Sequence, residues 1–145
     1  MSNGPLNRQQ LQERLLLSPF NAFLDLEVVS ADPERQEVVI QLKMREQFER
    51  LAGTAHWHGG PIAAAIDIVG DYALAMMLGN PLPTLNLRVD YLRPAKDTLT
   101  FTARVRRTGK TVGVVDVDVL NEAGELVAIG RANYSTANSV PHRKE

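Results

Sequence analysis

The chain has 145 residues, of which 44% are hydrophobic and 23% are charged, and its formal net charge is −1. These values predict one globular domain over residues 1–145, and they argue against a nucleic acid or an anionic membrane as a partner recognised through bulk charge. The chain contains no cysteine, which excludes disulfides, thiolate catalysis and cysteine-ligated metals.

The N-terminal segment is polar where a secretory signal would be apolar, which favours a cytoplasmic protein. Leu11 and Leu15 share one helical face, so we expect a short helix over residues 6–17, ended by Ser18-Pro19. Strands are expected at residues 23–30 and 37–44, with a turn at residues 31–34 between them. We expect the core of the domain to span residues 20–136 and residues 137–145 to form a flexible tail.

The longest apolar stretch, residues 61–78, predicts a long helix, because Pro61 suits a first helical turn and Gly79 suits a helix end. A membrane span only begins to be plausible at this length, and Asp67 and Asp71 interrupt the stretch, so a buried helix is favoured. The helix is apolar nearly all round. One sheet can cover only one side of it, so loops or a second subunit must cover the other.

Four more strands are expected at residues 84–92, 98–107, 111–120 and 125–136. The short turns between the last three strands predict antiparallel neighbours. The order of helix, two strands, long helix and four strands predicts an α+β protein. A long central helix wrapped by a curved antiparallel sheet is the hotdog architecture, and we expect that fold here.

The corner His58-Gly59-Gly60 leads directly into the long helix. Such a corner offers backbone N–H groups at the positive end of the helix dipole, where a developing oxyanion would be stabilised. Asp67 lies nearly two turns further along among alanine and isoleucine, where desolvation should raise its pKa and make it a stronger base. Asp71, one turn beyond on the same face, is the alternative carboxylate.

The chain resembles the PaaI-like branch of the hotdog acyl-CoA thioesterases from about residue 20 to residue 135. The resemblance rests on the His-Gly-Gly corner followed by a helical aspartate, and it continues through LNLRVDYLRPA, RRTGKTVGVVDVDV and GELVAIGRANY. It implies hydrolysis of an acyl-CoA thioester to a free acid and coenzyme A, without a cofactor or a metal. It also implies a homodimer that assembles further to a homotetramer.

The same resemblance implies roles for individual residues. The Gly59 N–H would polarise the thioester carbonyl, and His58 would hold the loop or assist that polarisation. Asp67 of the partner subunit would act as general base or nucleophile, and the Thr84 hydroxyl would help to orient water. Gly60 is expected to contact the substrate. Cations at strand ends and turns could bind the phosphates of coenzyme A, namely Arg93, Lys96, Arg106, Arg107 and Lys110.

The chain departs from the family pattern just before the corner. Many relatives carry an asparagine or a glutamine there as a second contact to the carbonyl oxygen, whereas Ala52 stands at roughly that place here. Gln47, Thr54 or His56 could supply the missing contact.

Other readings of these residues stay open. A metal site built from His56, His58 and Asp67 is conceivable but disfavoured, because the third histidine of the chain, His142, lies in the tail. The alternative functions are a hotdog hydratase or dehydratase, whose usual signature is absent, and a non-catalytic acyl-CoA-binding protein. The acyl group cannot be read from the sequence, although some residues are candidates to shape its pocket, namely Ile62, Tyr72, Leu78 and residues 45–57.

Overall fold

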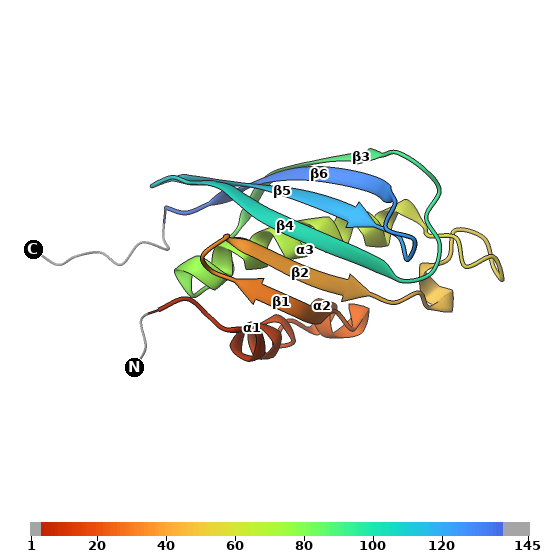
Figure 1. Cartoon of the computed structure of the whole chain (residues 1–145), viewed down its shortest axis with the longest axis horizontal. Coiled ribbons are helices and arrows are strands. Elements are labelled where there is room, and N and C mark those ends of the chain that lie inside the picture. The colour runs from red at the N-terminus through yellow and green to blue at the C-terminus, as the bar shows by residue number, and fades with distance from the viewer. Residues whose placement is uncertain (1–3, 138–145) are drawn as a thin grey trace, which may run out of the picture.

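A computed structural model describes residues 4–137, in which six strands form one antiparallel sheet in the order β1-β2-β4-β5-β6-β3. A 20-residue helix, α3 (Gly59–Leu78), lies against this sheet, as Figure 1 shows. The strands are β1 (Glu27–Asp32), β2 (Glu37–Leu42), β3 (Thr84–Tyr91), β4 (Leu99–Thr108), β5 (Val112–Leu120) and β6 (Leu126–Ser135). The α+β hotdog architecture expected from the sequence is confirmed.

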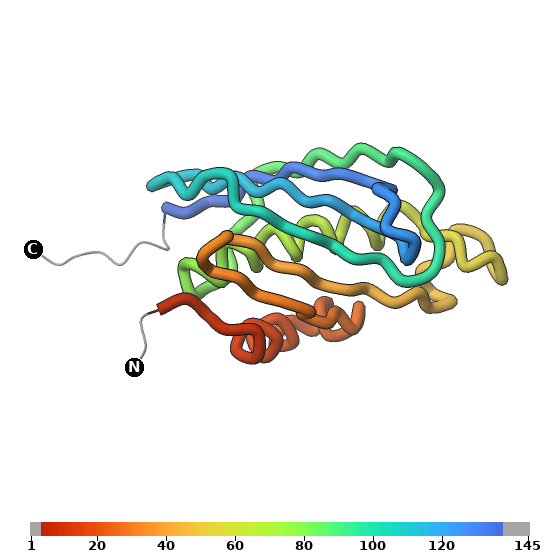
Figure 2. The backbone as a smooth tube through the Cα atoms, in the orientation of Figure 1, coloured from red at the N-terminus to blue at the C-terminus, as the bar shows by residue number. Residues whose placement is uncertain are grey.

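Two helices, α1 (Arg8–Leu15) and α2 (Pro19–Leu24), precede the sheet and lie beside β1, as the red and orange segments of Figure 2 show. The sequence predicted α1 but not α2, and it wrongly placed residues 23–26 in a strand that begins only at Glu27. The Ser18 hydroxyl accepts from the Asn21 N–H as an N-cap, and Pro19 takes the first helical position. Ser-Pro therefore both ends α1 and starts α2.

Helix α3 begins at Gly59, two residues before the expected start, and ends at Leu78 as expected. The C-cap residue Gly79 has a φ of 91°, in the left-handed region. Among the described residues it is the only helix long and apolar enough to span a membrane, but more than half of its apolar stretch is buried, as in a core helix. A Cβ at Gly130 of β6 would lie 2.4 Å from Ile66, so this glycine lets the helix pack closely on the sheet.

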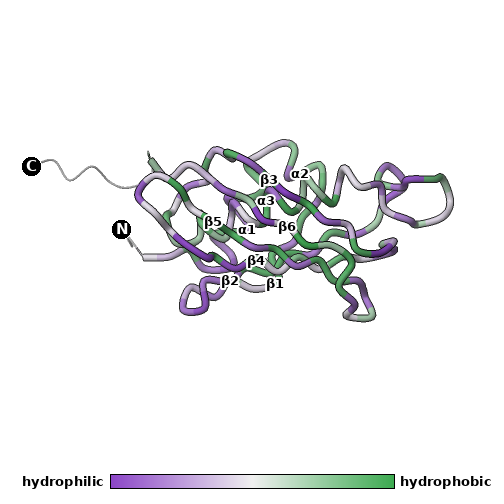
Figure 3. The backbone as a smooth tube through the Cα atoms, turned by 90° about the horizontal axis from the view of Figure 1, so that it is seen from above, coloured by the Kyte–Doolittle hydropathy of each residue, from purple (hydrophilic) through white to green (hydrophobic). Residues whose placement is uncertain are grey.

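The strands alternate between the helix-facing side and an outer, charged side, and hydrophobic and hydrophilic residues succeed one another along them in Figure 3. On the outer side Asp116 of β5 pairs with Arg131 at 2.6 Å. The edge strand β3 differs from the others. Its apolar residues alternate as predicted, yet Leu85 and Tyr91 are 54% and 52% exposed. Part of the apolar face of β3 is thus uncovered within one chain.

Candidate active site

The segment before α3 is held against the connection between β3 and β4. Trp57 donates its backbone N–H to the Ala95 carbonyl at 3.0 Å and its indole N–H to the Asp97 carbonyl at 2.7 Å. The Trp57 ring stacks on Phe48, and the His58 N–H donates to the Phe48 carbonyl at 2.9 Å. These contacts fix the path of the chain as it enters the helix.

The start of α3 leaves one backbone donor open. The imidazole Nδ1 of His58 accepts from the Gly60 N–H at 2.9 Å, so this side chain is the N-cap of the helix. Pro61 has no N–H. The N–H of Gly59 meets no acceptor within residues 4–137. The Gly59 N–H is therefore the group at this corner that can donate to a ligand.

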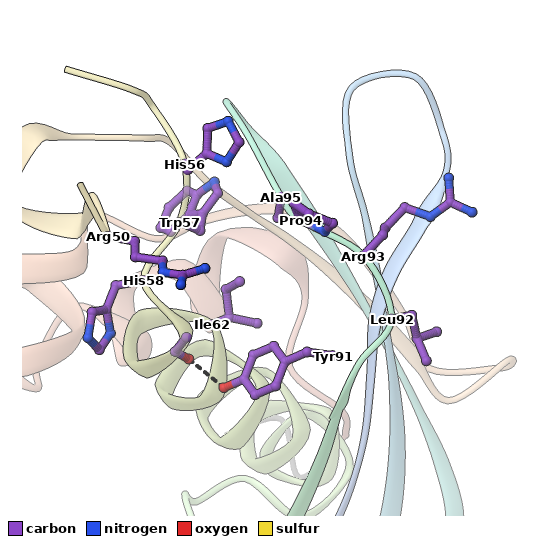
Figure 4. Close-up of a pocket in the computed structure, with 11 residues that line it drawn as sticks. Arg50, His56, Trp57, His58, Ile62, Tyr91, Leu92, Arg93, Pro94 and Ala95 are labelled. Atoms are coloured by element: carbon purple, nitrogen blue, oxygen red, sulfur yellow. Dashed lines mark hydrogen bonds between the residues drawn. The ribbon is translucent and has the colours of Figure 1, made fainter. Parts of the chain in front are cut away.

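Tyr91, at the end of β3, lies directly against Gly59. Its hydroxyl donates to the Gly59 carbonyl oxygen at 2.6 Å, the contact that Figure 4 marks with a dashed line. A Cβ on Gly59 would lie 3.1 Å from this hydroxyl oxygen, so the tyrosine leaves little space for any larger residue. Burial raises the pKa of Tyr91, which keeps its hydroxyl a donor. The sequence motif contained Tyr91, but nothing local indicated this contact.

A pocket of about 500 Å³ opens beside Gly59. Its apolar walls come from the loop, the helix and the end of β3, namely from Trp57, Ile62, Leu92, Pro94 and Ala95. In Figure 4 the side chain of Arg50 extends between Trp57 and Ile62, whereas Arg93 extends away from them. The sequence singled out Arg93 as a cation for the site, whereas it included Arg50 only within residues 45–57, the loop expected to help shape the acyl pocket. The pocket thus has the residue with the free N–H, Gly59, in the same lining as apolar side chains and cations.

The structure brings Asp67 and Thr84 together, although 17 residues separate them. The Thr84 hydroxyl donates to Asp67 Oδ1 at 2.7 Å. From the other side, the Tyr134 hydroxyl donates to the Asp67 backbone carbonyl at 2.6 Å, which ties this part of the helix to β6. The threonine therefore orients the Asp67 carboxylate and occupies one of its oxygens.

One turn further along, Asp71 accepts the Leu82 N–H at 2.7 Å. Burial raises the pKa of Asp71 to about 7, the Leu82 N–H opposes this rise, and the charge of Asp67 adds to it. From the sequence we expected such desolvation at Asp67. Helical spacing places both carboxylates on one face of α3 but does not tell which of them is more deeply buried.

The cations selected from the sequence do not gather at one place within a chain. Arg93 lines the pocket and pairs with Glu125, and the backbone of Lys96 bridges to His56. Arg106 pairs with Asp116, 3.6 Å away on the outer side of the sheet. The remaining two are Arg107, near the end of β4, and Lys110, in the β4–β5 turn. This turn lies at the opposite end of the sheet from the loop before α3 (Figures 1 and 2).

Of the candidates for the second carbonyl contact, only His56 lines the pocket. Gln47 is exposed on the short 3-10 helix η1 (Glu46–Phe48), and the Thr54 hydroxyl is engaged with the Leu51 carbonyl at 2.6 Å. Within the described part of the chain, no three His, Asp or Glu side chains come together as metal ligands, and His142 lies outside it. The alternative site from His56, His58 and Asp67 is therefore not assembled in one chain.

Among the acyl-pocket candidates, Ile62 lines the pocket beside Gly59. Tyr72 is buried further along α3, where its hydroxyl donates to the Arg14 carbonyl of α1 at 3.4 Å. Leu78 packs partly buried against the core at the far end of the helix. Of these three, Ile62 alone is in position to contact a ligand held at Gly59.

Comparison with known proteins gives consistent matches over most of the chain. The family described as "Thioesterase superfamily" matches residues 54–128. The chain is 31% identical over 144 residues to mouse acyl-coenzyme A thioesterase 13, covering 95% of this chain and 100% of the relative. It is 33% identical over 110 residues to acyl-coenzyme A thioesterase PaaI of Escherichia coli, covering 74% and 75%. Zebrafish thioesterase superfamily member 2 superposes with a TM-score of 0.80 at 28% identity, covering 90% and 99%.

Proposed function

Because the chain belongs to the thioesterase superfamily, we propose that it hydrolyses an acyl-CoA thioester to a free acid and coenzyme A. The single observation that carries this proposal is the unpaired N–H of Gly59 at the start of α3, because Gly59 lines a pocket with apolar walls. The names of the relatives support acyl-CoA as the substrate class.

In this mechanism the Gly59 N–H donates to the thioester oxygen and stabilises the charge that forms there when the carbonyl is attacked. His58 caps the helix through the Gly60 N–H, so its part is to hold the corner that presents Gly59. Asp67 acts either as the base that activates water or as the nucleophile that attacks the carbonyl carbon. When Asp67 acts as the base, it takes the proton of the attacking water, the C–S bond breaks, and the coenzyme A thiolate takes up that proton. When Asp67 attacks directly, the C–S bond breaks to leave an anhydride between the acyl group and Asp67, and water then hydrolyses this anhydride to the free acid and the carboxylate. The coenzyme A thiolate takes up the proton that this water releases.

Thr84 keeps one oxygen of Asp67 engaged and leaves the other to water or to the thioester. A carboxylate that cannot rotate freely is better placed for attack, since orientation is a large part of the catalytic effect. We therefore assign Thr84 to the orientation of Asp67, and through it of the attacking water.

Two chains are needed for this chemistry. Gly59 and Asp67 lie eight residues apart on one helix, which separates them by about 12 Å along its axis. One thioester cannot contact both groups of the same chain. We propose that the Gly59 N–H of one protomer faces Asp67 of the partner subunit in a homodimer, and that two dimers form a homotetramer.

The surface of the protomer supports such a dimer. The open face of β3 exposes Leu85 and Leu87, and the small half-exposed residues Ala63 and Ala64 lie on the same helical stripe as Asp67. Small residues let two helices approach closely, and an edge strand with an apolar face offers a surface that a second copy can cover.

The pocket beside Gly59 is proposed to take the part of the substrate next to the carbonyl carbon. Its volume and apolar walls suit a flexible chain such as an acyl group or the pantetheine arm. Arg50 and Arg93 are the cations nearest to this pocket and are proposed to bind the phosphates of coenzyme A. The remaining cations, Lys96, Arg106, Arg107 and Lys110, lie outside the pocket of their own chain, so we propose that any contact they make is to substrate in the partner's site.

A hydrolysis assay against a panel of thioesters tests the function directly. The purified protein is incubated with acetyl-, octanoyl-, palmitoyl- and phenylacetyl-CoA, and the released thiol is measured. We expect thiol release from at least one of them, and loss of that release in Asp67→Asn. A hydrated product without thiol would favour a hydratase, and binding without turnover would favour a non-catalytic acyl-CoA-binding protein.

A further inference from the structure

We propose that Asp71 is a positioning residue, which holds the connection between α3 and β3 so that Thr84 can orient the catalytic carboxylate of Asp67. This inference rests on the proposed function, because it takes Asp67 to be catalytic. Asp71 itself contacts neither the pocket nor the free Gly59 N–H.

Two carboxylates of α3 hold the same short segment. Asp71 accepts the Leu82 N–H at 2.7 Å, and Asp67 accepts the Thr84 hydroxyl at 2.7 Å. The two aspartates are four residues apart and therefore lie on one face of the helix. Their carboxylates accept from Leu82 and Thr84, which are two residues apart on the connection to β3. The helix therefore holds residues 82–84 at two points.

The Leu82 N–H is the natural place for such an anchor. Its two neighbours, Pro81 and Pro83, have no N–H, so it is the only backbone donor between Asn80 and Thr84. The Leu82 side chain is buried, so an unpaired N–H beside it would be costly. Asp71 satisfies this donor and thereby fixes the connection.

Strand pairing alone leaves Thr84 less well determined. Thr84 pairs with Tyr134 of β6, but the register shifts between Thr84 and Asn86, so an irregularity separates this pair from the regular ladder. The Ser135 N–H donates to the Pro83 carbonyl at 2.8 Å and holds the segment on the β6 side. The Asp71 anchor holds it on the helix side. The Thr84 hydroxyl then meets Asp67 from a segment that is fixed from both sides.

The surroundings of Asp71 make its charge sensitive to pH near neutrality. Asp67 faces it on the same helix, Tyr134 from β6, and Leu82 from the connection, while Tyr72 beside it reaches α1. The pKa of Asp71 is raised to about 7 by burial and by the charge of Asp67, so its ionisation changes the charge beside the catalytic carboxylate. Activity should therefore show an inflection near pH 7 that belongs to Asp71.

The test compares two substitutions of Asp71 on the acyl-CoA that the wild-type protein cleaves fastest. Asp71→Asn keeps an oxygen that accepts the Leu82 N–H, and we expect kcat within about 3-fold of wild type and no inflection near pH 7. Asp71→Ala removes the acceptor, and we expect kcat to fall by about 10-fold or more, with KM changed by less than about 3-fold. Asp71→Ser, whose hydroxyl is too short to replace the carboxylate, takes the place of Asp71→Ala if that variant does not fold.

A double-mutant cycle with Thr84→Val separates positioning from a general structural role. If Asp71 acts through Thr84, Asp71→Ala should lower kcat by less than about 3-fold once the Thr84 hydroxyl is absent. Equal losses in both backgrounds would overturn the proposal, as would wild-type kcat in both Asp71→Ala and Asp71→Ser.

A measurement without substrate keeps this inference distinct from the proposed function. In wild type the NMR shift of the Leu82 amide proton should titrate with a midpoint near pH 7, and Asp71→Asn should abolish that titration. A Leu82 amide shift that neither titrates in wild type nor changes in Asp71→Ala contradicts the anchor, whatever the enzyme cleaves. A protein that cleaves no acyl-CoA but shows this titration would contradict the proposed function while retaining the anchor.

Discussion

Two features of the structure favour glycine at position 59. Its N–H is left without an acceptor at the start of α3, and its Cα lies so close to Tyr91 that an added Cβ would be 3.1 Å from the hydroxyl oxygen. The tyrosine in turn holds the Gly59 carbonyl at 2.6 Å, so the orientation of the corner is set by a contact from β3. The start of α3 and a contact from the distant strand β3 thus both determine the geometry at Gly59.

Substitution of Gly59 by alanine tests how tightly Tyr91 fixes the corner. Gly59→Ala keeps the N–H, but Tyr91 must shift by a few tenths of an ångström, so we expect kcat to fall by about 10-fold. The double variant with Gly59→Ala and Tyr91→Phe lacks the hydroxyl oxygen, which is the atom nearest to the added Cβ, and should recover part of the lost kcat. Steady-state kinetics of the two variants checks this, and an unchanged kcat in Gly59→Ala would mean that the close contact has no bearing on catalysis.

Asp67 and Asp71 make a matched pair, because each can be replaced by an asparagine of the same shape. Asp67→Asn should lower kcat by at least about 100-fold, the scale of a lost general base, while the fold survives. Asp71→Asn should stay within about 3-fold of wild type, because the amide oxygen still accepts the Leu82 N–H. Circular dichroism shows whether each variant is folded. An inactive Asp71→Asn beside an active Asp67→Asn would reverse the assignment.

The raised pKa of Asp71 also predicts how stability depends on pH. The folded-state value of about 7 exceeds the ordinary value of 3.8, so the folded protein binds this proton more tightly than the unfolded chain does. The resulting stabilisation is complete below about pH 4 and is lost as pH rises to about 7. Its upper limit is about 4 kcal/mol, from 1.36 kcal/mol per pKa unit.

Urea unfolding of wild type and Asp71→Asn at equal protein concentration measures this effect. Between about pH 4.5 and 8, the free energy of unfolding of wild type should fall relative to that of the variant. A difference between the two proteins that is the same at both pH values would contradict the raised pKa.

Among the elements, α3 and β3 show what the sequence could and could not predict. The apolar run with Pro61 and Gly79 at its ends predicted α3 almost to the residue, because helix period and end residues are local. The alternation of β3 predicted its bounds, but not that Leu85 and Leu87 would stay exposed, since burial depends on what the strand packs against. Helix α2 was missed because Ser-Pro was taken only as a stop.

In the candidate site, too, local features could be predicted from the sequence, whereas contacts between distant residues could not. The sequence singled out the His-Gly-Gly corner, Asp67 and Thr84 as candidates, and the structure places the last two in a hydrogen bond. The contact of Tyr91 with Gly59 joins residues 32 positions apart, so no local pattern could indicate it. The position of Arg50 in the pocket likewise depends on how the loop before α3 folds back on the sheet.

The exposed face of β3 predicts a specific effect on assembly. Burying a leucine side chain fully is worth about 1.5–3 kcal/mol, so a charge at Leu87 should weaken a dimer formed through this face. We expect Leu87→Lys to sediment as a monomer and to lose activity. Val29→Lys is the matched control, because Val29 is also exposed but lies on β1 at the opposite edge of the sheet. A dimeric, active Leu87→Lys would place the interface elsewhere.

For the whole molecule, the central claim is that one active site is built from two chains. Gly59 and Asp67 are about 12 Å apart on one helix, so each chain presents a donor and a carboxylate that cannot meet at one thioester. Two copies with two-fold symmetry would form two sites, each with Gly59 of one protomer and Asp67 of the partner subunit.

The most direct test mixes two inactive variants. Asp67→Asn lacks the carboxylate, and Gly59→Pro lacks the N–H at a position where proline suits the first helical turn, with Gly59→Ala as the control that adds a Cβ but keeps the N–H. After equal amounts exchange subunits, half of the dimers are mixed, and each mixed dimer has one intact site of two. We predict activity of about one quarter of wild type. No recovery, with subunit exchange demonstrated and Gly59→Pro folded, would contradict a site shared between chains.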